Sequence, residues 1–450
     1  METQIKNSKS DFRILLRKES DNKIKIANKK FLLVSLRDPF MDSDRVMPPL
    51  GVMALQSYLL SLGIDSTIEN NFDLANTEKY SEYTHIAISC MTPQKIEAYN
   101  ILRAIKSMDK SKKVIIGGPH ANYYLEDCIK EPFDFIVVGD GEYALKTIVE
   151  DKANERILNI PITEEEMNKL PLPYRDPNFL KEYNFTIQGI NSSTILTAKG
   201  CPMKCAFCED AGTKVRLYYP DNIDKQISDV RNAGFEGIMF YDDIFAISKK
   251  RVNELSNVIG KYNIVYRAFG HAKSMDNEMA SMLSNSGCIE MGFGAESGSQ
   301  KILDIINKKT KVEENIRFVE ICNKHNIKVK AFIIVGLPGE DLSSINETKK
   351  FLDFLTSNKF INKFGKEITN DFDITIYFPY KGTAIRESID KNNKDFDIYF
   401  TRNPDEMLGF YKGINGAAEN VVRTSRLSSE EINKIQKELL DEYKKCVIKV

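Results

Sequence analysis

Three cysteines lie within eight positions near the middle of the chain, in the segment Lys199-Gly200-Cys201-Pro202-Met203-Lys204-Cys205-Ala206-Phe207-Cys208. The C-x3-C-x2-C spacing lets one loop turn three thiolates toward a single point, and soft sulfur donors select iron–sulfur clusters, zinc or Cu(I) over hard cations. Structural zinc wants a fourth Cys or His nearby, but His271 and Cys288 are far downstream. The pattern therefore favours a [4Fe–4S] cluster with one open iron over zinc or over three clustered core cysteines.

Composition gives no support to nucleic-acid binding or to a membrane protein. The 450 residues suggest two or three domains, and 63 basic against 64 acidic residues give a net charge of −1, which offers no field to attract nucleic acid or an anionic membrane. No apolar run approaches the ~20 residues of a membrane helix, and the first 30 residues lack the apolar core of a signal peptide. We expect a cytoplasmic protein with reduced thiols and structural roles for the scattered Cys90, Cys128, Cys288, Cys322 and Cys446.

Short apolar runs alternate with helix-sized stretches between residues 30 and 150. The expected strands are 31–36, 85–89, 114–116 and 133–138, and the expected helices are 50–62, 94–108 and 121–130. This alternation predicts a parallel sheet covered on both faces, and continuous apolar runs are typical of strands buried on both sides. The sequence thus predicts a Rossmann-like, doubly wound α/β domain at 30–150, after an N-terminal extension at 1–29 with a possible strand at 12–16.

The loops after these strands are candidate ligand-binding loops, because open α/β sheets bind ligands outside the carboxyl ends of their strands. Their glycines allow a large ligand to approach the backbone, but none forms the G-x-G-x-x-G pattern of dinucleotide-binding domains. His120 has a plainer explanation as a packing histidine, and Glu142 as an acid in a first helical turn. The candidates are Pro49, Leu50, Gly51, Met91, Thr92, Gly117, Gly118, Pro119, His120, Gly139, Gly141 and Glu142.

A second series of elements follows a proline-containing linker at 151–190. Strands are expected at 194–197, 237–241, 265–269, 290–295, 330–335 and 372–378, with helices at 223–233, 249–261, 276–286, 300–306, 312–325 and 342–356. These βα units predict a partial (β/α)6 barrel at 191–385, with its chemistry at the carboxyl ends of the strands. A small α-rich C-terminal region, 386–450, follows with helices expected at 406–419 and 428–445.

The cysteine segment resembles the cluster loop of the radical S-adenosylmethionine (SAM) enzymes, in which SAM chelates the open iron. The resemblance implies that Cys201, Cys205 and Cys208 hold a [4Fe–4S] cluster and that Phe207 lies near the adenine of SAM. The segments 240–245, 292–299 and 332–340 resemble SAM-contacting strand ends of the same family, although such residues are also common in turns and caps. Arg267 is a further candidate partner for the SAM carboxylate. The implied SAM contacts are Asp242, Asp243, Glu296, Ser297 and Gly336, with Glu296 implied to accept hydrogen bonds from the ribose hydroxyls.

Residues 30–150 resemble the cobalamin-binding domain that precedes the radical SAM core in one large subfamily. The resemblance lies in the segments 48–51, 117–121 and 134–142. The Asp-x-His-x-x-Gly motif that supplies a cobalt ligand in other cobalamin proteins is not present in the sequence, so the lower ligand is not specified. In this subfamily the region after the barrel helps to close the substrate pocket, which makes Asp405, Tyr411, Lys412 and Arg423 candidates for facing the substrate.

Together these resemblances imply a cobalamin-dependent radical SAM enzyme that methylates an unactivated carbon or phosphorus of a small molecule. Such enzymes cleave SAM reductively to a 5′-deoxyadenosyl radical and take the methyl group from methylcobalamin, with electrons from a donor such as flavodoxin or ferredoxin. Cyclisation, rearrangement or epimerisation with the same cofactors is an alternative. A zinc- or cluster-binding sensing module is an alternative of another class.

Overall fold

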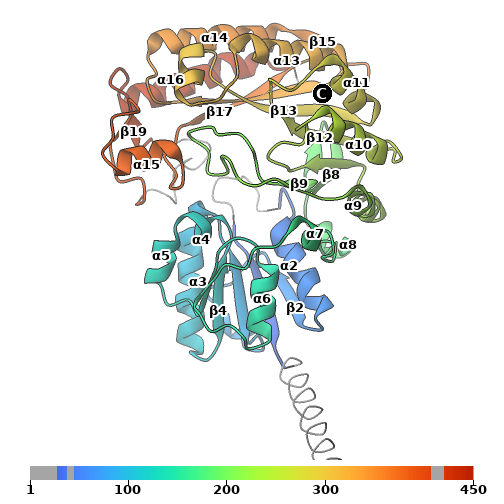
Figure 1. Ribbon diagram of the computed structural model, residues 1–450, viewed down its shortest axis with the longest axis vertical. Helices are drawn as coiled ribbons and strands as arrows, with labels where there is room; N and C mark the ends of the chain where they lie inside the picture. The colour runs from blue at the N-terminus through green and yellow to red at the C-terminus, as the bar shows by residue number, and fades with distance from the viewer. Residues whose placement is uncertain (1–27, 38–44, 407–419, 449–450) are drawn as a thin grey trace, which may run out of the picture. The chain divides into compact units, whose positions relative to one another are not determined.

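The computed structural model describes residues 28–37, 45–406 and 420–448. The strand expected at 12–16 lies outside the described residues, as does the helix expected at 406–419 beyond its first position. The chain divides into two compact units. We call the described part of residues 1–38 and 49–174 the N-terminal unit, and that of 39–48 and 175–450 the barrel unit; both are drawn in Figure 1.

The N-terminal unit is a six-stranded, wholly parallel sheet in the order β2-β1-β3-β4-β5-β6. The order reverses between β1 and β3, as in doubly wound sheets that bind a ligand at that point. Its strands are β1 Lys30–Ser35, β2 Asp65–Glu69, β3 His85–Ser89, β4 Lys113–Gly117, β5 Phe135–Val137 and β6 Ile157–Leu158, and its helices include α2 Leu50–Ser61, α3 Lys95–Met108, α4 Pro119–Tyr123, α5 Leu125–Lys130 and α6 Glu142–Val149.

Both faces of this sheet are buried. In β1, Leu32 and Val34 pack in a cluster that includes residues of α3, whereas Phe31 and Leu33 pack in a second cluster with residues of α2 and α6. Successive side chains of a strand point to opposite faces, so an unbroken apolar run supplies both layers at once. This confirms the predicted doubly wound fold.

The barrel unit contains six parallel strands in chain order, which confirms the predicted partial barrel. The strands β8, β11, β12, β13, β14 and β17 are neighbours in that order, and β7 adds an antiparallel edge beside β8. They span β7 Thr186–Ile187, β8 Ile190–Ile195, β11 Gly237–Phe240, β12 Val265–Gly270, β13 Cys288–Glu296, β14 Lys328–Val335 and β17 Asp371–Ile376. The curved sheet is visible beneath its helices in Figure 1.

Helices cover this sheet between successive strands. They are α9 Pro220–Asn232, α10 Lys249–Ile259, α11 Asn277–Asn285, α12 Gln300–Ile305, α13 Val312–Lys324, α14 Leu342–Ser357, α15 Ala384–Asp390 and α16 Ser429–Tyr443. In β14 every second residue, such as Ala331 and Ile333, is buried, while Lys330 and Phe332 lie on the opposite, less buried face. Gly292 of β13 makes room on that face, because a Cβ there would lie 2.7 Å from the Phe269 ring.

Some local expectations differ from the structure. The helix expected at 121–130 is two helices, α4 and α5, which meet at Tyr124. Tyr124 is buried and its ring stacks on His120, so packing of this side chain takes precedence over helix continuity. The edge strands β2 and β6 were not predicted.

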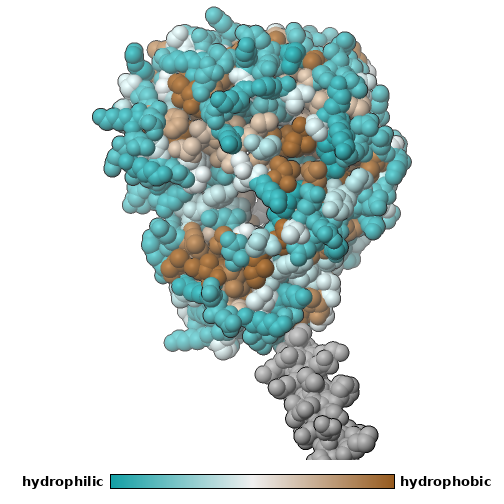
Figure 2. All heavy atoms as spheres, viewed as in Figure 1, coloured by the Kyte–Doolittle hydropathy of each residue, from teal (hydrophilic) through white to brown (hydrophobic). Residues whose placement is uncertain are grey.

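No helix of the described residues is long and apolar enough to cross a bilayer. Figure 2 shows a largely hydrophilic face with local apolar areas, one of them on the N-terminal unit. Exposed apolar side chains of that unit include Met91 and Ile96, which lie at or near the end of β3. Exposed apolar groups there are compatible with a ligand that covers them.

Candidate active site

A cavity of about 330 Å³ lies at the carboxyl ends of the barrel strands. Strand-end loops are where barrels of this kind carry their chemistry. The lining comes entirely from the barrel unit: from the cysteine loop, from β12, β13, β14 and the segments that follow β11 and β12, and from the loop after α12. The predicted residues that it brings together are Cys201, Cys205, Phe207, Cys208, Asp242, Asp243 and Glu296.

The two ends of the cysteine loop are joined by a short antiparallel pair of strands, β9 Ala198–Lys199 and β10 Arg216–Leu217. Gly200 begins the loop with φ of +92°, and a Cβ at this position would lie 2.5 Å from the Lys214 carbonyl oxygen. The segment that follows α12 also fixes the loop. The Ala206 N–H donates to the Ile306 carbonyl at 2.9 Å, and the Asn307 side-chain amide donates to the Lys204 carbonyl at 2.6 Å. Only glycine satisfies both the positive φ and the close approach at position 200.

The three thiols fit a cluster by chemistry and by location. All eight cysteines are unpaired, and these three share one cavity. Burial raises the pKa of each thiol, that of Cys208 to about 12. Ligands must be thiolates, so metal binding has to offset this shift. Within the described ranges no three His, Cys, Asp or Glu side chains already stand as a metal-ligating group.

A buried ion pair lies beside the thiols. Lys308 Nζ is 2.7 Å from Glu296 Oε1, and the two side chains are 10% and 7% exposed. Burial lowers the pKa of Lys308, but Glu296 and the Cys205 thiol outweigh burial, so its pKa stays above the usual 10.5. The lysine is therefore charged and supplies a positive field to the loop. This would favour the thiolate form of the cysteines.

The backbone around this pair is unusual. Glu296 has φ of +60°, a conformation that non-glycine residues rarely adopt. A Cβ on Gly294 would lie 2.0 Å from Glu296 Oε1 and 2.7 Å from Lys308 Nζ. A side chain at position 294 would thus displace the ion pair. Backbone strain of this kind is held in place by surrounding contacts and is often found at functional sites.

The two aspartates after β11 lie in different environments. Asp242 is 2% exposed and accepts hydrogen bonds from the Thr197 N–H, at 2.6 Å, and from the Thr197 hydroxyl. Burial raises the pKa of Asp242 to about 6. Asp243 is exposed and accepts from the Gly200 N–H at 3.2 Å. Asp242 therefore fixes the end of β8, while Asp243 keeps acceptor capacity for a ligand in the cavity.

Three predicted SAM contacts do not line the cavity in the part of the chain that the structure describes. Arg267 pairs with Glu290 at 3.2 Å inside the barrel. Ser297 is fully buried, and its hydroxyl accepts the Ser299 N–H at 3.1 Å, so it stabilises the turn into α12. The Gly336 N–H donates to the Glu340 carboxylate at 2.5 Å in the turn after β14.

Several lining residues were not predicted. Lys308 lies in a loop between helices and has no spacing signal in the sequence. His271 directly follows β12, and this position after a barrel strand was the available signal. Aromatic rings of Tyr241, Phe269 and Phe332 complete the wall, with Phe269 centred 6.2 Å from Tyr241 and 6.1 Å from Phe332.

The candidate cobalamin loops all follow the carboxyl ends of parallel strands in the N-terminal unit. Gly118 has φ of +90°, and a Cβ there would lie 2.9 Å from the Cys90 carbonyl oxygen, so two of these loops touch. The exposed members of the predicted set are Gly51, Met91, Pro119 and Gly139. The half-buried members are Pro49, Leu50, Gly117, Gly118 and Gly141, and the buried members are Thr92, His120 and Glu142. The loops thus present backbone and small or apolar groups at one edge of the sheet, which fits a large corrin.

Two predicted members of this set have structural contacts instead. His120 is fully buried, with Nε2 2.9 Å from the Tyr99 hydroxyl, which agrees with a packing histidine. Gly141 allows α6 to approach α2, because a Cβ there would lie 2.9 Å from Leu55. The contact of His120 with Tyr99 does not support a role for His120 as a cobalt ligand.

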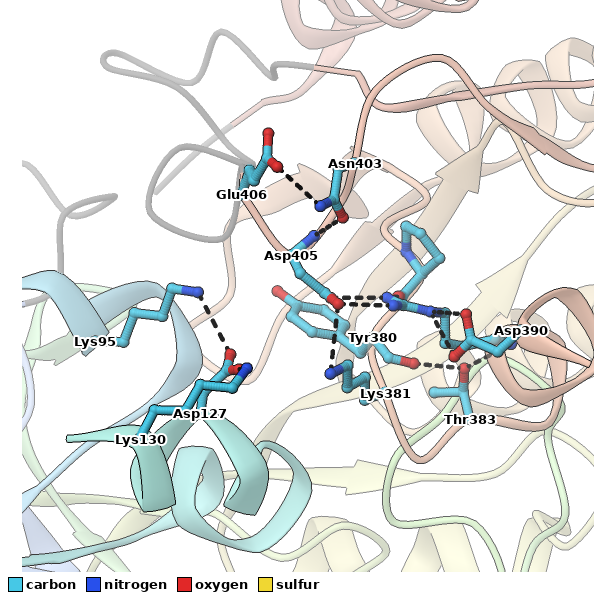
Figure 3. A network of polar contacts seen from close by, with 12 residues as sticks. Lys95, Asp127, Lys130, Tyr380, Lys381, Thr383, Asp390, Asn403, Asp405 and Glu406 are labelled. Carbon is cyan, nitrogen blue, oxygen red and sulfur yellow. Dashed lines mark hydrogen bonds and ion pairs between the residues drawn. The ribbon is translucent and has the colours of Figure 1, made fainter.

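The C-terminal residues expected to face the substrate are placed differently. Asp405 pairs with Arg386 through two hydrogen bonds of 3.0 and 2.9 Å, and with Lys381 at 3.4 Å (Figure 3). Arg423 lies over the Tyr399 ring, 4.5 Å from its centre. Tyr411 and Lys412 lie outside the described residues. Asp405 therefore anchors the chain after α15, and this contact takes up the carboxylate that we expected to meet substrate.

Fold and site together define a class: a partial barrel with three cysteines in a cavity at its strand ends, joined to a doubly wound unit. Residues 195–352 match the family model of the radical SAM superfamily, and residues 42–149 match that of the B12 binding domain. The chain belongs to the radical SAM enzymes that carry a B12-binding domain. The cofactors of this class are a [4Fe–4S] cluster, SAM and cobalamin.

Sequence relatives include enzymes with different named reactions. The chain is 25% identical over 381 residues to an uncharacterized methyltransferase of Pyrococcus horikoshii, covering 77% of this chain and 79% of that one. It is 25% identical over 333 residues to bacteriochlorophyllide d C-8(2)-methyltransferase of Chlorobaculum tepidum, covering 69% and 72%. It is 22% identical over 344 residues to the anaerobic magnesium-protoporphyrin IX monomethyl ester cyclase of Rubrivivax gelatinosus, covering 67% and 61%.

Solved structures share the fold. The methyltransferase TsrM from Kitasatospora setae, with cobalamin and a [4Fe–4S] cluster bound, matches with a TM-score of 0.68 and 14% identity, over 94% of this chain and 89% of that one. OxsB with aqua-cobalamin and SAM bound matches with a TM-score of 0.64 and 18% identity, over 76% of this chain. The match spans about half, 54%, of the OxsB chain.

Proposed function

We propose that this chain is a cobalamin-dependent radical SAM methyltransferase that acts on an unactivated carbon or phosphorus of a small molecule. The observation that carries the proposal is the meeting of Cys201, Cys205 and Cys208 in one strand-end cavity, in a chain that also has a B12-binding domain. Relatives named as methyltransferases support methyl transfer over other radical outcomes.

The residues of the cavity have separable roles in this proposal. The three thiolates hold the cluster and leave one iron for SAM. Asp243, which is exposed, accepts a hydrogen bond from the amino group of SAM, and the charge of Lys308 favours its carboxylate. Phe207 and the aromatic wall exclude water. When bound, the cluster and SAM supply a carbon-centred radical, and cobalamin supplies the methyl group.

The proposal also requires reducing surroundings. A cluster with an open iron needs an electron donor, for which we propose a flavodoxin or ferredoxin. We place the enzyme in the cytoplasm, because free thiols persist in reducing compartments. All eight cysteines are unpaired in the structure, which supports this assignment.

The test is to identify the products of SAM. Anaerobically reconstituted full-length chain is incubated with SAM and a reductant, with and without hydroxocobalamin. Methyl transfer predicts 5′-deoxyadenosine together with S-adenosylhomocysteine, the second only when cobalamin is present. Deoxyadenosine alone would contradict methyl transfer and favour cyclisation or rearrangement, the reaction type named for the cyclase relative. Stoichiometric zinc without SAM cleavage would contradict an enzyme and favour a sensing module.

A further inference from the structure

His271 is a buried polar side chain in the cavity to which the proposed mechanism gives no role. It lines the cavity directly after β12 and is 5% exposed. Neither of its ring nitrogens has a hydrogen-bond partner of proper geometry among the described residues. A buried polar group without a partner is costly, and such groups in native proteins call for a specific explanation. A ligand in the cavity that hydrogen-bonds to the ring would supply one.

The backbone that carries the His271 ring is held by hydrogen bonds. The His271 carbonyl accepts from the Ser274 N–H at 3.1 Å and from the Ser274 hydroxyl at 3.0 Å. The preceding Phe269 carbonyl accepts the N–H groups of Phe245 and Ala246 at 2.9 and 3.2 Å. Hydrogen bonds on both sides therefore hold the end of β12. The ring is presented to the cavity by a rigid turn, which is the arrangement a positioning residue requires.

The ring is neutral in this environment. Burial, followed by the positive charge of Lys308, lowers the pKa of His271 to about 4. A neutral imidazole has one donor and one acceptor nitrogen. Whichever tautomer the neutral ring adopts, one of its nitrogens is therefore an acceptor, and it calls for a ligand that donates.

The charged groups of the cavity are either bound to other residues or match the ammonium and carboxylate of SAM, not its ribose. Glu296, the predicted ribose contact, is bound to Lys308 at 2.7 Å, and Asp242 is bound to Thr197. The ammonium and carboxylate of SAM are matched by charged groups beside the cysteine loop. The ribose hydroxyls are neutral donors, and a neutral acceptor held in a buried site matches them.

We propose that His271 positions SAM by accepting a hydrogen bond from a ribose hydroxyl, in place of the ribose contact expected from Glu296. The inference rests on the proposed function, since it takes the cavity to be the SAM site. His271 acts here as a specificity-determining residue for the nucleoside.

The test compares affinities for SAM and for its 2′-deoxy and 3′-deoxy analogues in the cluster-reconstituted full-length chain. One hydrogen bond corresponds to about a three- to tenfold change in affinity. We expect the wild type to bind one deoxy analogue more weakly than SAM by that factor. H271F should bind SAM more weakly by the same factor and no longer distinguish SAM from that analogue.

Controls separate this role from a structural one. H325F makes the same change elsewhere in the barrel unit and should still distinguish SAM from the deoxy analogue as the wild type does. H271Q, which retains an acceptor, provides a second variant if H271F folds poorly. The inference would be overturned if H271F distinguished SAM from the deoxy analogue as strongly as the wild type does. It would also be overturned if the wild type did not distinguish them and H271Q did. A wild type that holds its cluster but does not bind SAM would instead overturn the proposed function itself.

Discussion

The Lys308 ammonium lies 2.7 Å from the Glu296 carboxylate and 5.8 Å from the centre of the Phe207 ring. This one side chain therefore links the end of β13 to the loop that carries the cluster cysteines. The pair is buried, and it requires glycine at position 294, because a Cβ there would lie 2.0 Å from Glu296 Oε1. The strand end, the charge and the cysteine loop form one assembly.

Lys308→Met should destabilise the full-length chain strongly. The substitution leaves the Glu296 carboxylate buried without its partner, and breaking a buried pair in this way costs about 3–5 kcal/mol. The urea midpoint of unfolding, measured anaerobically, should fall accordingly. The matched control is Lys169→Met, which removes an exposed ion pair with Glu165 and should leave the urea midpoint nearly unchanged. Equal effects of the two substitutions would contradict the structural role of the pair.

Gly200→Ala should block cluster assembly. The new Cβ would lie 2.5 Å from the Lys214 carbonyl, in a residue with φ of +92°. Gly234 has the same φ of +92° but no atom within 4 Å of a Cβ, so Gly234→Ala carries the backbone strain alone, about 1 kcal/mol. Iron bound per chain should therefore fall severalfold in the first variant and stay near wild type in the second. If the two variants bind equal amounts of iron, close packing at position 200 is not what shapes the loop.

The buried Glu340 predicts a loss of stability with rising pH. Burial raises the pKa of Glu340 to about 8 from its usual 4.5, although the Gly336 N–H opposes the shift. The folded chain holds this proton up to about pH 8, whereas the unfolded chain releases it near pH 4.5, so folding stability falls as pH rises between these values. Glu340→Gln should flatten this part of the pH dependence of the urea midpoint. The surface change Glu438→Gln should leave it intact, and a wild-type slope that survives in Glu340→Gln would refute the assignment.

Much of the fold follows from the sequence, because apolar runs such as 31–36 and 330–335 supply the buried strands directly. Short edge strands such as β2 do not carry that signal, since four of its five residues are charged or hydroxylic and only Ser66 is buried. The cysteine loop could be predicted because its three cysteines lie close together in the sequence. Lys308 and His271 meet it only through folding, so spacing could not reveal them. The sequence also could not show that the Ser297 hydroxyl is hydrogen-bonded to Thr348 and to the Ser299 N–H, because these contacts depend on the turn.

Arg386 should hold the chain after α15 in place. It donates to Asp390 at 2.8 Å and to Asp405 at 2.9 Å, two residues labelled in Figure 3. The Arg386 side chain is 6% exposed. Arg386→Ala leaves two carboxylates, both partly exposed, and should cost about 1–3 kcal/mol. Limited proteolysis should then cleave faster near Asp405.

Lys391 offers a matched control for Arg386, because it lies at the end of the same helix in an exposed pair with Glu387. Lys391→Ala should leave the proteolysis pattern unchanged. Cleavage that is no faster in Arg386→Ala than in Lys391→Ala would show that the network does not anchor this segment.

The central claim, that Cys201, Cys205 and Cys208 bind a cluster with one open iron, is tested most directly by iron and sulfide analysis with electron paramagnetic resonance on anaerobically reconstituted chain. We predict about four irons and four sulfides per chain and a spectrum of the reduced protein that changes when SAM is added. The iron, the sulfide and the spectrum should be lost in the triple Cys→Ala variant. They should be retained in Cys446→Ala, which removes an exposed cysteine. One zinc per chain, or a cluster that survives the triple substitution, would contradict the account.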